Sequence, residues 1–160
     1  MWDYGTAGFE ATDLKFYIFT RHVRDKDQFG LLDSLVEHGD FGCSTFEYAG
    51  IGLVSRDLLD SVLEISFLER HLGIFERNDI RVLDIGAGYG RMAHRLLTAH
   101  PRIESYACVD AVPESTFLSE FYLKHRGLDH RARSHSSRRA RRSATAQCRI
   151  QPRDQHPQLL

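Results

Sequence analysis

Residues 82–91 read VLDIGAGYGR, and this stretch decides the fold. A short run rich in β-branched and aliphatic residues, 81–85, leads into three alternating glycines. Such a run, without helical periodicity, predicts a buried parallel strand. Gly86, Gly88 and Gly90 predict a bend that uses positive φ angles and presents bare backbone to whatever lies above it.

The elements that follow repeat the same alternation. Apolar residues at helical spacing over 91–100 predict a helix that ends before Pro101. Residues 106–110, YACVD, predict a second buried strand, and Pro113 suits the first position of another helix. Strand, helix, strand and helix in this order predict an α/β fold with right-handed crossovers, the first βαβα unit of a Rossmann-like sheet.

The spacing of the glycines separates several classes of cofactor. A dinucleotide fingerprint, GxGxxG, would place its third glycine at position 91, where the chain has Arg91. A phosphate-binding loop would need Gly-Lys-Ser/Thr, which is absent from this segment. The remaining pattern is D-x-G-x-G-x-G, with Asp84 two residues before the first glycine.

This pattern resembles the first motif of class I S-adenosylmethionine-dependent methyltransferases. In that family the glycine loop lies against the methionine and ribose of the cofactor, and an acid that ends the second strand binds the ribose hydroxyls. Asp110 stands in that place, and a carboxylate can accept both hydroxyls in charge-assisted bonds. For Asp84, bracing the loop and contacting the cofactor's amino group are both open. The resemblance implies S-adenosylmethionine as cofactor and these binding residues: Asp84, Gly86, Ala87, Gly88, Gly90, Asp110 and Ala111.

Longer segments are similar to a narrower family. Residues 46–64 (FEYAGIGLVSRDLLDSVLE), 84–96 (DIGAGYGRMAHRL) and 109–123 (VDAVPESTFLSEFYL) resemble sugar O-methyltransferases of bacterial polysaccharide and glycoside pathways. The resemblance covers about residues 40–126 and implies a small-molecule acceptor, a sugar or glycoside hydroxyl. It identifies no catalytic residue. A complete sheet of this class has about seven strands, as the resemblance implies, and the sequence shows two.

The N-terminal part, residues 1–75, is predicted to be a helical segment. Apolar residues recur at helical spacing over 11–39, and four glycines then predict a loop over 39–54. Ser55 is a predicted N-cap for a helix that ends at Gly73. In the loop, Glu47 and Tyr48 have two interpretations, a lid over the cofactor or plain packing.

Other residues near the glycines also keep two interpretations. Tyr89 is consistent with flanking a ligand or with helix–sheet packing. Arg91 is predicted to face solvent or an acid rather than the cofactor.

The chain changes character near Gly127. Residues 1–125 carry 12 Lys and Arg against 20 Asp and Glu, a net −8, whereas residues 126–160 carry 9 Arg against 2 Asp, a net +7. With no aromatic residue after position 126, we predict that 127–160 is a disordered Arg/Ser-rich tail behind a partial cofactor domain at 76–126. We expect a truncation or frameshift after about residue 133, and hence marginal stability and little activity.

Several classes of function are disfavoured by composition. No stretch approaches the roughly 20 apolar residues of a membrane span. Three dispersed cysteines suit reduced thiols in the cytoplasm, and the histidines show no metal-binding spacing. Nucleic acid is not the expected partner, because the basic tail lacks interleaved aromatics. Two rivals to a methyltransferase stay open: an NAD-dependent oxidoreductase domain, and a non-enzymatic binding module that uses the basic tail. The sequence leaves the oligomeric state open.

Overall fold

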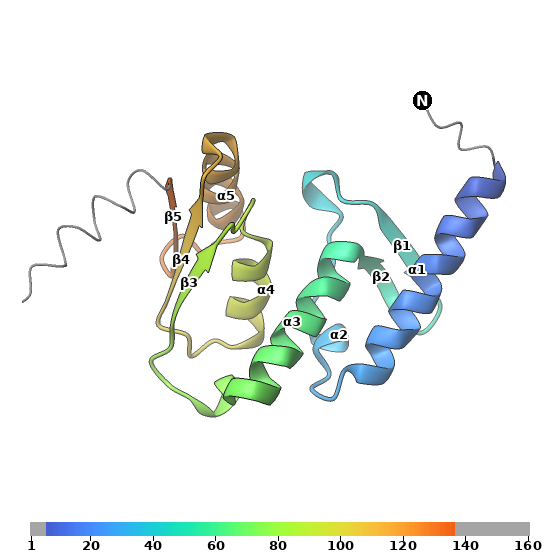
Figure 1. Cartoon of the computed structure of the whole chain (residues 1–160), viewed down its shortest axis with the longest axis horizontal. Helices are drawn as coiled ribbons and strands as arrows, with labels where there is room; N and C mark the ends of the chain where they lie inside the picture. Colours follow the sequence, from blue (N-terminus) through green and yellow to red (C-terminus); the bar gives the residue numbers. More distant parts are fainter. Residues whose placement is uncertain (1–5, 137–160) are drawn as a thin grey trace, which may run out of the picture.

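A computed structural model describes residues 6–136 as an α/β fold with a helical N-terminal part (Figure 1). The elements in chain order are α1 Thr6–Lys26, α2 Leu31–Ser34, the 3-10 turn Asp40–Gly42, β1 Thr45–Tyr48, β2 Gly52–Ser55, α3 Arg56–Leu72, the 3-10 turn Ile74–Glu76, β3 Arg81–Ile85, α4 Arg91–Ala99, β4 Ser105–Asp110, α5 Pro113–His125 and β5 Ala132–Ser136.

The sheet that follows α3 is parallel and has the strand order β3-β4-β5. Leu83 lies opposite Ala107, and Cys108 lies opposite Ser134. The connections run through α4 and α5, which lie together beside the sheet in Figure 1. This arrangement confirms the predicted α/β class and the βαβα order of residues 81–125.

The third strand, β5, corrects the prediction of disorder from residue 127 onward. Tyr106 N donates to Arg131 O over 2.9 Å, and β5 then pairs along β4. Ala132 is buried, and Ser134 Oγ lies 2.8 Å from Ser119 Oγ on α5. The backbone of β4 supplies the pairing, so this strand forms without the large apolar residues by which sequence patterns reveal strands. Residues 137–160, the rest of the predicted tail, lie outside the described residues.

The N-terminal part differs from the prediction in two places. The predicted helix over 11–39 is interrupted, because α1 ends at Lys26 and Gly30 adopts a φ of +66°. The Asp27 carboxylate accepts hydrogen bonds from the N–H groups of Leu31 and Leu32, which favours a new helix start. The predicted loop over 39–54 contains an antiparallel hairpin, β1 with β2.

Helix α3 forms as predicted and joins the two halves of the chain. Ser55 Oγ accepts from Leu58 N over 3.0 Å, and Gly73 ends the helix at a φ of +60°. Its apolar stripe is buried against the N-terminal elements and α4, and includes Leu58, Leu59, Val62 and Ile65.

A buried ion pair ties the N-terminal part to α4. Arg95 Nη2 lies 3.0 Å from Glu37 Oε2, and the two side chains are 5% and 4% exposed. Glu37 also accepts from the Ser55 hydroxyl and from the N–H groups of His38 and Gly39. The Arg95 guanidinium in addition donates to the Val36 carbonyl. The carboxylate is therefore a hub that satisfies buried donors from three segments.

A second buried polar group, His94, makes the free energy of unfolding depend on pH. Its Nδ1 lies 2.7 Å from Tyr122 Oη, and burial, with the nearby Arg95 and Arg126 charges, lowers the pKa of His94 to about 3. Because the unfolded chain takes up this proton near its ordinary pKa of about 6.5, stability falls as the pH drops below that value, by about 1.4 kcal/mol per pH unit. Urea unfolding at about pH 7 and about pH 5.5 should differ by about 1–1.5 kcal/mol.

The matched variants are His94→Gln and His71→Gln, the second on the exposed end of α3. We expect His94→Gln to flatten this dependence and His71→Gln to preserve it. An unchanged slope in His94→Gln would show that another group controls the acid sensitivity.

Candidate cofactor site

The glycine loop between β3 and α4 is bound to the end of β4. Gly86 N and Ala87 N donate to Val109 O over 2.8 and 3.3 Å. Gly86, Gly88 and Gly90 have φ angles of +85°, +56° and +88°, a region that residues with a Cβ rarely adopt. The sequence prediction of a bend with positive φ is confirmed.

Asp110 ends β4 directly beside this loop. Its Oδ2 accepts from Gly88 N over 2.9 Å, and its Oδ1 accepts from Val112 N over 2.8 Å. These backbone donors, Val112 first and then Gly88, lower the pKa of Asp110, so its carboxylate is ionised at neutral pH. The structure therefore brings together the bend and the acid that the sequence selected. Ala111 follows Asp110 and is exposed at the same edge of the sheet.

The three glycines differ in what surrounds them. A Cβ built on Gly86 or Gly88 would meet no atom within 4 Å, so the backbone there borders open space. At Gly90 a Cβ would lie 2.9 Å from Ser119 Oγ and 3.3 Å from Leu123 on α5. Gly90 thus has a packing role, whereas Gly86 and Gly88 leave room for a ligand.

Asp84 contacts a side chain rather than the loop backbone. Its Oδ2 accepts from Tyr106 Oη over 2.9 Å. Burial, followed by the Asp84 charge, raises the pKa of Tyr106 far above its ordinary value, so the phenol remains a donor. The structure therefore does not show the interpretation in which Asp84 braces the loop through backbone N–H groups, because its carboxylate accepts from Tyr106 instead.

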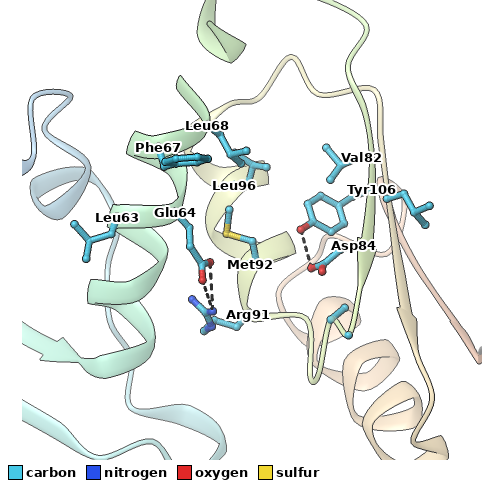
Figure 2. A pocket seen from close by; sticks show the side chains of 13 residues that line it. Leu63, Glu64, Phe67, Leu68, Val82, Asp84, Arg91, Met92, Leu96 and Tyr106 are labelled. Atoms are coloured by element: carbon cyan, nitrogen blue, oxygen red, sulfur yellow. Dashed lines mark hydrogen bonds and ion pairs between the residues drawn. The ribbon is translucent and has the colours of Figure 1, made fainter. Parts of the chain in front are cut away.

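A pocket of about 630 Å³ opens beside β3, between that strand and helices α3 and α4 (Figure 2). Figure 2 shows the Tyr106 hydroxyl directed to Asp84 and the Arg91 guanidinium directed to Glu64. The remaining walls are mostly aliphatic and aromatic. Its lining residues are Leu63, Glu64, Phe67, Leu68, Val82, Leu83, Asp84, Gly86, Ala87, Arg91, Met92, Leu96 and Tyr106. Three of the predicted cofactor residues, Asp84, Gly86 and Ala87, therefore border a cavity with apolar walls and a charged rim.

Sequence reasoning missed Asp57, the α3 residue that accepts hydrogen bonds from Tyr89 and Arg91 and so holds the glycine loop to that helix. The Tyr89 hydroxyl donates to the Asp57 carboxylate, and Arg91 Nη1 donates to Asp57 O over 3.1 Å and to Ser61 Oγ over 2.7 Å. Arg91 Nη2 also lies 3.2 Å from Glu64, as expected for an arginine that faces an acid. Burial, then Asp57, raises the pKa of Tyr89 far above its ordinary value. These contacts between the loop and α3 fix the loop on the side that faces the N-terminal part.

The hairpin does not place Tyr48 over the glycine loop. Tyr48 Oη donates to Asp13 on α1, with the carbonyl oxygen at 3.0 Å, and its ring packs edge-on against Tyr17. Of the two interpretations of this segment, packing is the one that the structure shows for Tyr48.

Comparison with known proteins gave structural matches alone. No family model matches the chain, and no curated protein matches it. YcgJ from Bacillus subtilis is 30% identical over 44% of this chain and 29% of its own, with a TM-score of 0.35. Coclaurine N-methyltransferase bound to N-methylheliamine and SAH is 15% identical over 74% of this chain and 35% of its own, with a TM-score of 0.40. The N-terminal domain of human METTL16 in complex with SAH is 7% identical over 74% of this chain and 54% of its own, with a TM-score of 0.35. The chain spans less than two thirds of the length of each of these structures.

Two further observations concern residues 6–136. None of their helices combines the length and the apolar character needed to cross a membrane. Within the same residues, His, Cys, Asp and Glu form no group of three or more that could hold a metal ion.

Proposed function

We propose that this chain binds S-adenosylmethionine at the glycine loop and belongs functionally to the methyltransferases that act on a hydroxyl group, specifically a sugar hydroxyl. One observation carries the proposal: the 2.9 Å hydrogen bond from Gly88 N to the Asp110 carboxylate, at the carboxyl end of two paired parallel strands. In open α/β sheets this edge is where ligands bind. The sugar acceptor is supported by the resemblance of residues 46–64, 84–96 and 109–123.

The residues present suit the cofactor's chemistry. Gly86 and Gly88 leave the space above the loop free of side chains, so an adenosyl ligand can approach the backbone. Asp110 uses one lone pair of each oxygen for backbone N–H groups, and a carboxylate has about four such sites. Both of its oxygens can therefore accept a ribose hydroxyl as well.

Methyl transfer requires mainly that the acceptor oxygen be aligned with the methyl group of the cofactor. When bound, the cofactor supplies a methyl group made electrophilic by its sulfonium. The chain's task is to hold the loop in place and keep an acceptor oxygen in line with that methyl group. The Tyr89–Asp57 bond and the Arg91–Glu64 ion pair hold the loop in this way.

Titration calorimetry with S-adenosylhomocysteine tests the proposal. We expect the wild-type chain to bind it, and Asp110→Asn to weaken binding by about 10- to 100-fold, the cost of losing charge-assisted hydrogen bonds. The matched control is Asp129→Asn, which alters an exposed aspartate in the connection between α5 and β5 and should leave affinity unchanged. Binding of NAD⁺ in place of S-adenosylhomocysteine would refute the proposal in favour of an oxidoreductase domain, and absence of both would refute it outright.

A further inference from the structure

A second pocket lies on the N-terminal side of the glycine loop. It has a volume of about 390 Å³, within the range of small-molecule sites. The first turn of α3, the turn before β1 and one face of α1 form its walls. The lining residues are Thr12, Phe16, Phe41, Gly42, Cys43, Ser44, Phe46, Arg56 and Asp57.

Aromatic rings form the apolar walls of this pocket. The rings of Phe16 and Phe46 stack with centroids 4.1 Å apart and planes at 21°. Phe41 adopts a φ of +62°, unusual for a residue with a Cβ, and its ring lies parallel to that of Tyr89 with centroids 6.3 Å apart. Strained backbone of this kind costs about 1–3 kcal/mol and persists where the surroundings enforce it. Phe41 therefore lines this pocket and also faces Tyr89 of the glycine loop.

The polar part of the pocket is shared with the glycine loop. Asp57 lines the pocket, and its carboxylate accepts the Tyr89 hydroxyl from the loop. Arg56 supplies a cation, held in a loose pair with Asp60 at 3.4 Å. Burial, then the Glu37 and Asp57 charges, raises the pKa of the Cys43 thiol, so this group stays neutral. One cation and one anion leave the lining with no net charge, which favours a neutral ligand that both donates and accepts hydrogen bonds.

We propose that this pocket binds the acceptor, and that the acceptor is a glycoside ring. A pyranose presents flat C–H faces that pack on phenyl rings and hydroxyl groups that donate to Asp57 and accept from Arg56. The shared Asp57 places such a ring next to the glycine loop. The role of the glycoside as methyl acceptor rests on the proposed function. Binding of the glycoside itself is tested independently of the cofactor.

The experiment is an amide chemical-shift titration of the full chain. The probes are the methyl glycosides of glucose, galactose and rhamnose, each added alone up to about 100 mM, enough to saturate a millimolar site. We expect at least one of them to shift the amides of residues 42–44 in a saturable way. Arg56→Gln should weaken that binding by about fivefold or more, since a hydrogen bond to a charged group is lost. Arg81→Gln is the matched control, because both arginines are about three-quarters exposed and form surface ion pairs, 77% and 75%.

The outcomes separate the two proposals. If a glycoside shifts the amides of residues 42–44 in a saturable way and S-adenosylhomocysteine does not bind, the pocket is a glycoside site and the methyltransferase proposal fails. If S-adenosylhomocysteine binds and all three glycosides leave residues 42–44 unchanged, the pocket assignment is overturned. Tighter binding of tetramethylammonium at the same amides overturns the glycoside class as well, since it would mark an aromatic site for cations.

Discussion

Replacing Glu37 by leucine is expected to lower the free energy of unfolding by about 3–5 kcal/mol, the cost of leaving one partner of a buried ion pair alone. Arg95 would keep its charge in a site where its side chain is 5% exposed. The hydroxyl of Ser55 and the N–H groups of His38 and Gly39 would lose their acceptor at the same time. Because small domains have about 5–15 kcal/mol of stability, a loss of this size would unfold part of the population.

Urea unfolding followed by circular dichroism measures the effect. The control is Asp33→Asn, which breaks the surface pair of Asp33 with Arg24, at 2.7 Å, where the aspartate is 65% exposed. Exposed pairs contribute about 0–1 kcal/mol, so this variant should unfold close to wild type. A Glu37→Leu variant that unfolds as close to wild type as the control is expected to would show that the Glu37 hub does not stabilise the fold.

The same carboxylate adds an acid limit to stability. Burial alone would raise the pKa of Glu37, but hydrogen bonds from Ser55 and Gly39 and the charge of Arg95 outweigh it and lower the pKa below 4.5. A lowered carboxyl pKa gives stability that is present above the unfolded value and is lost as the pH falls through the folded one. Its window lies below that of His94, whose effect starts near pH 6.5. Acid unfolding should therefore show two successive contributions.

The sequence predicts best those parts of the fold that carry a local signal. The glycines at 86, 88 and 90 mark the end of β3, because only residues without a Cβ take such φ angles easily. Ser55 and Gly73 mark the two ends of α3 in the same way. The proximity of Asp110 to the loop also follows, since the carboxyl ends of adjacent parallel strands meet at one edge.

The elements that sequence reasoning missed depend on partners distant in the chain. Strand β5 has a sequence of small and polar residues, ARSHS, and exists because the backbone of β4 offers it a ladder. In the sequence, Asp57 is an acidic residue in the first turn of a predicted helix, where acids are common and do not indicate a tertiary contact. Its bond to Tyr89 joins residues 32 apart, and no periodicity in the sequence encodes that contact.

Gly90→Ala is expected to destabilise the fold by about 2–4 kcal/mol, the sum of a positive φ for alanine and an overpacked contact. The new methyl group would lie 2.9 Å from Ser119 Oγ and 3.3 Å from Leu123, both on the buried face of α5. Ser119 also bonds Ser134 of β5 at 2.8 Å, so α5 cannot yield without disturbing that strand. Thermal and urea unfolding would measure the loss.

Gly86→Ala is the informative comparison, because the two glycines have nearly the same φ, +85° and +88°, and differ in their surroundings. Alanine at 86 meets open space, so it should carry the backbone strain of about 1–2 kcal/mol without the overpacking. Its methyl group would instead occupy the space proposed for the cofactor. The variant should therefore lose more free energy of S-adenosylhomocysteine binding than free energy of unfolding. The opposite ranking, with Gly86→Ala the less stable variant and cofactor binding intact, would mean that the open side of the loop serves packing and that no ligand lies against it.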